Sequence, residues 1–101
     1  MEFKNFPKLN GLKNITMETT ALKLMEEAGE LSQAISKFRG LNGEKVEMTD
    51  EEILDKIVSE LLDVMQVCAT MTYVLEDNYD IDLQNSLKEH IKKLAKKGYT
   101  E

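Results

Sequence analysis

Residues 49–76 read TDEEILDKIVSELLDVMQVCATMTYVLE, and this stretch decides the fold. It opens with a capping box, in which Thr49 is expected at the N-cap and Glu52 at the third helical position. Apolar side chains then recur every three or four residues, which is the period of one face of an α-helix. They are Leu54, Ile57, Val58, Leu61, Val64, Met65, Cys68, Met71 and Leu75. The stretch therefore predicts a long amphipathic helix that ends near Leu75 or Glu76.

The same helical period occurs on both sides of this stretch. A helix is expected over residues 16–39, before the break Gly40-Leu-Asn-Gly43, and another over residues 82–97, after a turn at residues 78–81. The apolar stripe of the first helix is Ala21, Leu24, Met25, Ala28, Leu31, Ile35 and Phe38. No segment shows the alternation of a strand. The predicted fold class is all-α, a compact antiparallel helical domain of three to four helices.

Two segments lack the helical period. Residues 1–15 contain the only proline and three asparagines, and we interpret them as an N-terminal arm anchored by Phe3 and Phe6. Residues 44–48 are expected to form a polar connector. Residues 16–101 are predicted to be a single helical domain, because a chain of 101 residues is shorter than most two-domain proteins.

The composition excludes several classes of protein. A net charge of −6 argues against a general affinity for nucleic acid or for acidic membranes. No run of about 18 apolar residues appears, and the first ten residues lack the apolar core of a signal peptide. The single cysteine, Cys68, allows no disulfide within the chain. We expect a cytoplasmic protein that binds neither nucleic acid nor membrane.

Two short segments share one pattern of acidic, apolar and glutamine side chains. Glu27-Ala-Gly-Glu30-Leu31-Ser-Gln33-Ala34 is matched by Glu60-Leu-Leu-Asp63-Val64-Met-Gln66-Val67. The two carboxylates of each pattern are three residues apart, which places them on one helix face about 5–6 Å apart at Cβ. Four oxygen donors that converge between two antiparallel helices are what a Mg²⁺ or Mn²⁺ site requires. The alternative is that all four are solvated surface side chains.

The two patterns also have the same position relative to the apolar stripes. At about 100° per residue, the first carboxylate of each pair lies about 100° and the second about 160° from the centre of its stripe. Between the first two acids stands Gly29, although glycine within a helix costs about 1 kcal/mol relative to alanine. Close approach of another backbone or of a ligand is therefore expected at Gly29.

Two other kinds of site are excluded. Ferritin-like di-iron bundles use two Glu-x-x-His pairs, whereas this chain has one histidine, His90. A P-loop ends in Gly-Lys-Ser or Gly-Lys-Thr, and the glycine-containing break at residues 40–43 has no such ending.

The segment Glu26-Glu27-Ala-Gly-Glu30-Leu31, followed after a helix–loop–helix by Glu60-Leu-Leu-Asp63, resembles a known signature. It is the EExxE…ExxD motif of the MazG-like all-α nucleoside triphosphate pyrophosphohydrolases, and the resemblance covers about residues 18–76. It implies a homodimer or homotetramer that uses Mg²⁺, or Mn²⁺ in its place, to hydrolyse a nucleoside triphosphate to the monophosphate and pyrophosphate. By motif position, the metal ligands and catalytic carboxylates would be Glu27, Glu30, Glu60 and Asp63. Glu26, the extra acid, is assigned to substrate binding.

The C-terminal end departs from the pattern of many short relatives. Those relatives end in a Lys…Lys-Asn…Arg-Gly-aromatic run that contacts phosphate, whereas residues 90–99 read HIKKLAKKGY. Lys93 and Lys97 keep the positive charge and would bind substrate, while His90 and Leu94 replace a lysine and the asparagine. The competing hypothesis is a non-catalytic helical dimerisation or partner-binding module on a degenerate pyrophosphohydrolase scaffold. The changed C-terminal run favours that hypothesis, and the two intact carboxylate pairs oppose it.

Overall fold

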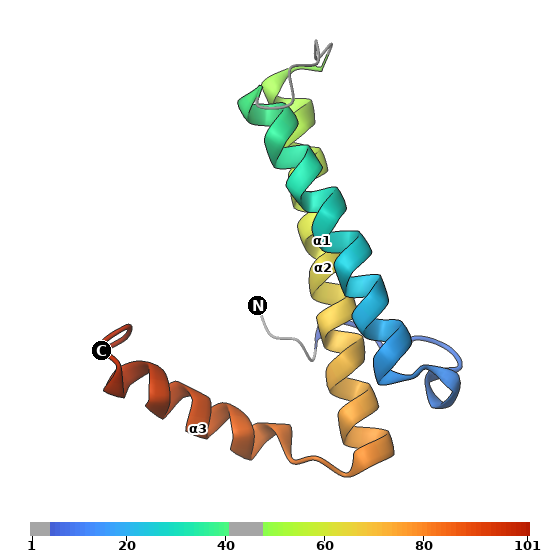
Figure 1. The fold of residues 1–101 in the computed structure, drawn as a ribbon, viewed down its shortest axis with the longest axis vertical. Coiled ribbons are helices and arrows are strands. Elements are labelled where there is room, and N and C mark those ends of the chain that lie inside the picture. The colour runs from blue at the N-terminus through green and yellow to red at the C-terminus, as the bar shows by residue number, and fades with distance from the viewer. Residues whose placement is uncertain (1–4, 41–47) are drawn as a thin grey trace.

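A computed structural model of the chain describes residues 5–40 and 48–101. Its elements in chain order are a short 3-10 turn η2 (Leu12–Asn14) and three helices, α1 (Met17–Arg39), α2 (Asp50–Tyr79) and α3 (Leu83–Lys96). No strand occurs in these two ranges. Helices α1 and α2 run antiparallel side by side, and α3 stands apart from them (Figure 1). The predicted all-α class is confirmed.

Local sequence signals set the ends of the helices. Thr16 caps α1 and Thr49 caps α2, and each threonine side chain accepts a hydrogen bond from the backbone N–H three residues further on. The capping box predicted at Thr49 and Glu52 is confirmed, since the Glu52 carboxylate in turn accepts from the Thr49 N–H. Gly40 ends α1 as predicted, in the left-handed region at φ 66°. The remaining break and connector residues, 41–47, lie outside the described residues.

Helix α2 is longer than predicted. It continues to Tyr79 rather than ending at Leu75 or Glu76, so the first half of the predicted turn at residues 78–81 is helical. The helix ends where Asp80 enters the left-handed region at φ 54° and the N–H of Ile81 donates to the Leu75 carbonyl at 3.2 Å. Aspartate is one of the few residues besides glycine that adopts this conformation readily. The prediction placed the end of α2 too early because it took Asn78 and Asp80, residue types that are common in turns, as the signal that the helix had already ended.

The N-terminal arm folds back onto α2. Side chains of α2 hold it at three points, which are Tyr73 Oη to the Phe6 carbonyl (2.6 Å), Gln66 Nε2 to the Pro7 carbonyl (3.1 Å) and Asp77 to Lys8 Nζ (3.0 Å). At Phe6 this contact is made by the backbone carbonyl, so anchoring by the Phe6 side chain stays a prediction, and Phe3 lies outside the described residues. The arm thereby becomes part of the surface beside α1 and α2.

The predicted apolar stripes coincide only in part with the faces that α1 and α2 turn toward each other. The buried apolar residues are Ala34, Ile53, Ala69 and Val74, whereas Met25 is 75% exposed and Val58 53%. On α1 the face toward α2 includes Glu27 instead. A hairpin of two helices offers each helix a single contact, so an apolar face wider than that contact stays uncovered.

Helix α3 buries no residue within the chain. It has one apolar face, made by Leu83, Leu87, Ile91 and Leu94, of which Leu87 is 50% and Ile91 54% exposed. The radius of gyration is 16.9 Å, compared with about 13 Å for a globular chain of this length. The single chain therefore leaves a large apolar surface without cover.

Helix α2 is long and apolar enough to cross a membrane by length and composition alone. The core helix of a soluble protein passes the same test, and α2 carries the buried carboxylate Glu60 on the side facing α1. That the chain binds no membrane stays a prediction.

Candidate functional site

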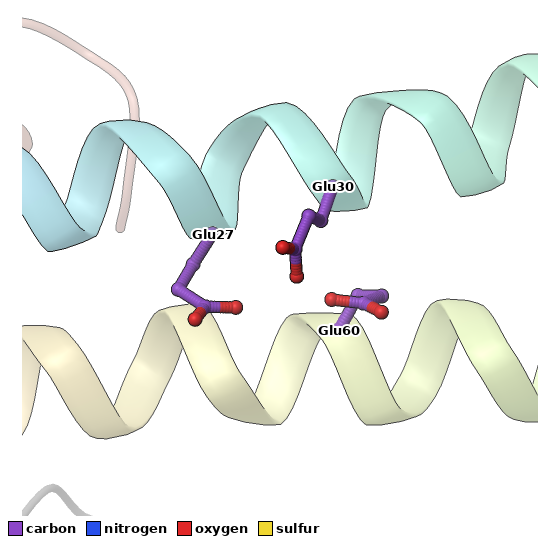
Figure 2. Close-up of side chains that lie close together, drawn as sticks. All are labelled: Glu27, Glu30 and Glu60. Atoms are coloured by element: carbon purple, nitrogen blue, oxygen red, sulfur yellow. The ribbon is translucent and has the colours of Figure 1, made fainter.

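Three glutamates meet between the two long helices. Glu27 and Glu30 project from α1 toward Glu60 of α2, as Figure 2 shows, and one carboxylate oxygen from each lies within 4.8 Å of the others. Glu27 and Glu60 are buried, with 7% and 8% of their surface exposed, and Glu30 is exposed. The repeated pattern predicted that antiparallel packing would bring the two acidic segments face to face, and these three residues are brought together. We call them the glutamate cluster.

The buried carboxylates of the cluster are only half satisfied. Glu27 Oε1 pairs with Lys23 Nζ at 3.2 Å, and Glu60 Oε1 pairs with Lys56 Nζ at 3.4 Å. The second oxygen of each, Oε2, is buried and has no hydrogen-bond partner within the described ranges. A buried acceptor without a partner costs about 1–3 kcal/mol, and more when it is charged. A cation between the helices would satisfy both oxygens.

The two lysines are functional candidates that the sequence reasoning missed. Lys23 and Lys56 each stand four residues before the first glutamate of their pattern, so the repeat is longer, Lys-x-x-x-Glu-x-x-acid. This longer repeat was the signal that could have revealed them. The side chains of Lys23 and Lys56 are 58% and 51% exposed, so each ion pair is worth at most about 1 kcal/mol. Ion pairs this weak leave most of the negative charge of the cluster uncompensated.

The pKa shifts of Glu30 and Lys23 both indicate an excess of negative charge at the cluster. The pKa of Glu30 is raised above 4.5, first by the charge of Glu27 and then by a hydrogen bond to Glu60 and its charge. The pKa of Lys23 is raised above 10.5 by its hydrogen bond to Glu27, then by the charges of Glu27 and Glu26. The field at the cluster therefore favours cations.

The sequence matches the family model of the MazG nucleotide pyrophosphohydrolase domain over residues 15–98. This chain belongs to the MazG family. MazG domains act on nucleotides and are typically metal-dependent, which agrees with the acidic residues between α1 and α2. No curated protein and no solved structure matched the chain significantly.

The other predicted MazG site residues lie outside the cluster. Asp63 is exposed on α2 and is not among the three grouped carboxylates. Glu26 is exposed and pairs with Lys23 at 3.6 Å. Lys93 and Lys97 are exposed at the end of α3, which stands away from α1 and α2 in the single chain (Figure 1). The roles assigned to these four residues stay predictions.

Gly29 has no explanation in the packing of the single MazG chain. A Cβ atom added there would meet no atom of the described residues within 4 Å. No backbone segment of the described residues approaches Gly29, so close approach of a ligand, the other alternative, stays a prediction. The position faces open space beside the glutamate cluster.

Proposed function

We propose that this MazG protein hydrolyses nucleoside triphosphates to the monophosphate and pyrophosphate at the glutamate cluster. The observation that carries the proposal is the pair of buried Oε2 atoms of Glu27 and Glu60, which have no partner in the described residues. Membership of the MazG family supplies the class of reaction. The buried oxygens supply the reason that a cation belongs between the helices.

The donor set fits Mg²⁺, with Mn²⁺ as a substitute. Both ions prefer hard oxygen ligands, and carboxylates are the usual protein ligands of Mg²⁺ in phosphate chemistry. Glu27, Glu30 and Glu60 would hold the ion, and Asp63, in the same motif as Glu60, is proposed as a fourth ligand. When bound, the ion supplies polarisation of the phosphoryl oxygens and positive charge that offsets the repulsion between triphosphate and carboxylates.

The chain's own side chains would prepare this site. Lys23 and Lys56 hold one oxygen of Glu27 and of Glu60, which leaves the second, buried oxygen of each available to an ion. Ligands fixed in this way lose little conformational freedom when they bind. Because Glu30 is the exposed member, it would border the incoming substrate, with Glu26 on the neighbouring turn of the same helix.

We also propose that the chain works as a homodimer or homotetramer. The support is the uncovered apolar surface, which includes Leu54, Val58 and Leu61 on α2 and Leu87 and Ile91 on α3. Exposed apolar surface of this extent is typical of an interface. The last turn of α3 is basic, so α3 of a second copy would bring Lys93 and Lys97 to the acidic site, where they would bind the substrate phosphates.

A second candidate function is a non-catalytic helical dimerisation module. The observation that favours it is the unpartnered apolar face of α3, together with the replacement of two polar residues in the C-terminal run by His90 and Leu94. Such a module has no use for a bound cation. Metal dependence therefore separates the two proposals.

The test is pyrophosphate release from a panel of canonical and modified ribo- and deoxyribonucleoside triphosphates, with Mg²⁺, Mn²⁺ or EDTA. We expect release that requires metal, is lost in Glu60→Gln, and persists in Glu18→Gln, which removes the same charge at an exposed position in the first turn of α1. Equal release by wild type and Glu60→Gln would reject the assigned site. No release from any substrate by the folded wild type would favour the dimerisation module.

A further inference from the structure

An open cavity of about 230 Å³ lies beside the glutamate cluster, lined by the N-terminal arm, α1 and α2. Its wall is apolar at Leu9, Ile15 and Val67 and polar at Lys23, Gln66 and Thr70. Lys23 is shared by the two sites, because its Nζ is also 3.2 Å from Glu27 Oε1. A molecule in the cavity would therefore be one side chain away from the cluster.

The cavity has the properties of a small-molecule site. Such sites are concave and mostly apolar, with a few polar groups that fix orientation. Lys23 and Glu27 are four residues apart, which is about 6 Å along the helix axis. A ligand whose charged end occupies the cluster would thus place a neighbouring ring at the mouth of the cavity.

Gln66 gives the cavity a polar group of known orientation. Its Nε2 lies 3.1 Å from the Pro7 carbonyl and 3.4 Å from Thr70 Oγ1. A carbonyl only accepts hydrogen bonds, so the atom facing Pro7 is the donor nitrogen and Oε1 is the acceptor. Gln66 is also the glutamine of the second repeated pattern, a position for which the metal site gives no reason.

We propose that this cavity holds the base of the nucleotide whose phosphates lie at the glutamate cluster, and that Gln66 contacts the edge of the base through Oε1. The inference rests on the proposed function and adds the part of the site that recognises the substrate. An acceptor at this place favours a base that presents an amino N–H over one that presents a carbonyl. The enzyme is therefore expected to prefer dCTP to dUTP.

The first test fills the cavity. Val67→Phe places a larger side chain in its wall, and Asn78→Phe places the same side chain at an exposed position of the same helix, outside the cavity. We expect Val67→Phe to raise KM for deoxynucleoside triphosphates by about tenfold, because the base loses its apolar contact. The rise in melting temperature on adding Mg²⁺ should stay as in wild type, and Asn78→Phe should leave KM unchanged.

The second test keeps the cavity open and changes its polar group. Gln66→Leu removes the acceptor and one hydrogen bond to the arm, whereas Tyr73→Phe removes the arm's bond at Phe6 and leaves the cavity lining unchanged. We expect Gln66→Leu to reduce the ratio of kcat/KM for dCTP over dUTP by about tenfold, the effect of one lost hydrogen bond. Tyr73→Phe should leave that ratio unchanged, since a looser arm affects both substrates alike.

The outcomes separate this inference from the proposed function. A wild type that turns over no nucleoside triphosphate overturns both. If the wild type is active and Val67→Phe has the same KM, the base site alone is overturned. If Val67→Phe does not fold, an unchanged ratio of kcat/KM for dCTP over dUTP in Gln66→Leu overturns the base site. A raised KM in Val67→Phe together with a lowered ratio in Gln66→Leu supports the inference.

Discussion

Replacing Glu60 with glutamine should make the metal-free protein more stable and remove its stabilisation by Mg²⁺. Glutamine has nearly the same shape as glutamate but carries no charge. The substitution therefore removes one of the carboxylates that crowd the space between α1 and α2, and one ligand of the proposed ion. Few single substitutions raise the stability of a metal-free protein and abolish its response to metal at once, which makes the pair of effects diagnostic.

The structure decides the sign of the first effect. Oxygens of Glu27 and Glu60 lie within 4.8 Å of each other, and two unit charges at that distance repel by about 3.5 kcal/mol at an effective dielectric constant near 20. Against this, the substitution loses the pair with Lys56, whose side chain is 51% exposed, and such a pair contributes at most about 1 kcal/mol. Relief of repulsion exceeds the lost ion pair, so the free energy of unfolding in EDTA should increase.

The second effect follows from linkage between binding and folding. At a Mg²⁺ concentration of 100 times Kd, wild type gains about 2.7 kcal/mol. With an unfolding entropy of about 2.1 cal/mol/K per residue, a 101-residue chain gains about 13 °C in melting temperature. If loss of one anionic ligand weakens binding by about 100-fold, the gain at the same concentration falls to about 0.4 kcal/mol, or about 2 °C.

Circular dichroism melts of wild type, Glu60→Gln and the control Glu18→Gln, each in EDTA and in Mg²⁺, measure both effects. We expect Glu60→Gln to melt above wild type in EDTA and to respond little to Mg²⁺, while Glu18→Gln responds like wild type. A Glu60→Gln protein that is stabilised by Mg²⁺ as strongly as wild type would refute the reasoning. So would a lower melting temperature in EDTA, because the cluster would then not be repulsive.

Three further predictions follow from other parts of the chain. Because the pKa of Glu30 is raised above 4.5 in the folded state, its ionised carboxylate destabilises the metal-free protein at neutral pH, and this penalty disappears as the pH falls through the raised pKa. In EDTA, Glu30→Gln should therefore melt above wild type at pH 7 and lose that advantage toward pH 4.5. A difference in melting temperature that stays constant with pH would show that the pKa of Glu30 is not raised. Thr49→Ala deletes the cap of α2 and should lower the free energy of unfolding by about 1 kcal/mol in urea; no change would mean that the cap is not used. Ile91→Asp charges the apolar face of α3 and should convert the proposed oligomer to monomer in sedimentation velocity; an unchanged mass would exclude α3 from the proposed interface.

The helices were predictable because their signals are local. The caps at Thr16 and Thr49 and the stop at Gly40 depend on hydrogen bonds and dihedral angles within a few residues, which the sequence states directly. The end of α2 was predicted a turn too early. The sequence indicates a turn near Asp80, but it does not indicate which residue of that turn adopts the left-handed conformation that ends the helix.

The site was predictable in part. The repeated spacing identified Glu27, Glu30 and Glu60, because residues three apart share a helix face whatever the tertiary fold. The burial of Glu27 and Glu60 was not foreseen, since amphipathicity alone placed them beside the apolar stripe rather than in the contact between helices. Which face of a helix meets its neighbour depends on all the surfaces that must be covered, and the pattern of one helix does not contain that information.

The most direct measurement of the central claim is a crystal structure of the protein soaked with Mn²⁺, with the ion located by its anomalous scattering. The account predicts a peak between α1 and α2, about 2.1 Å from carboxylate oxygens of Glu27, Glu30 and Glu60, the distance typical of such ligands. A fully ordered cluster without a peak, with the ion bound elsewhere or not at all, would contradict the assignment of these three glutamates as a metal site.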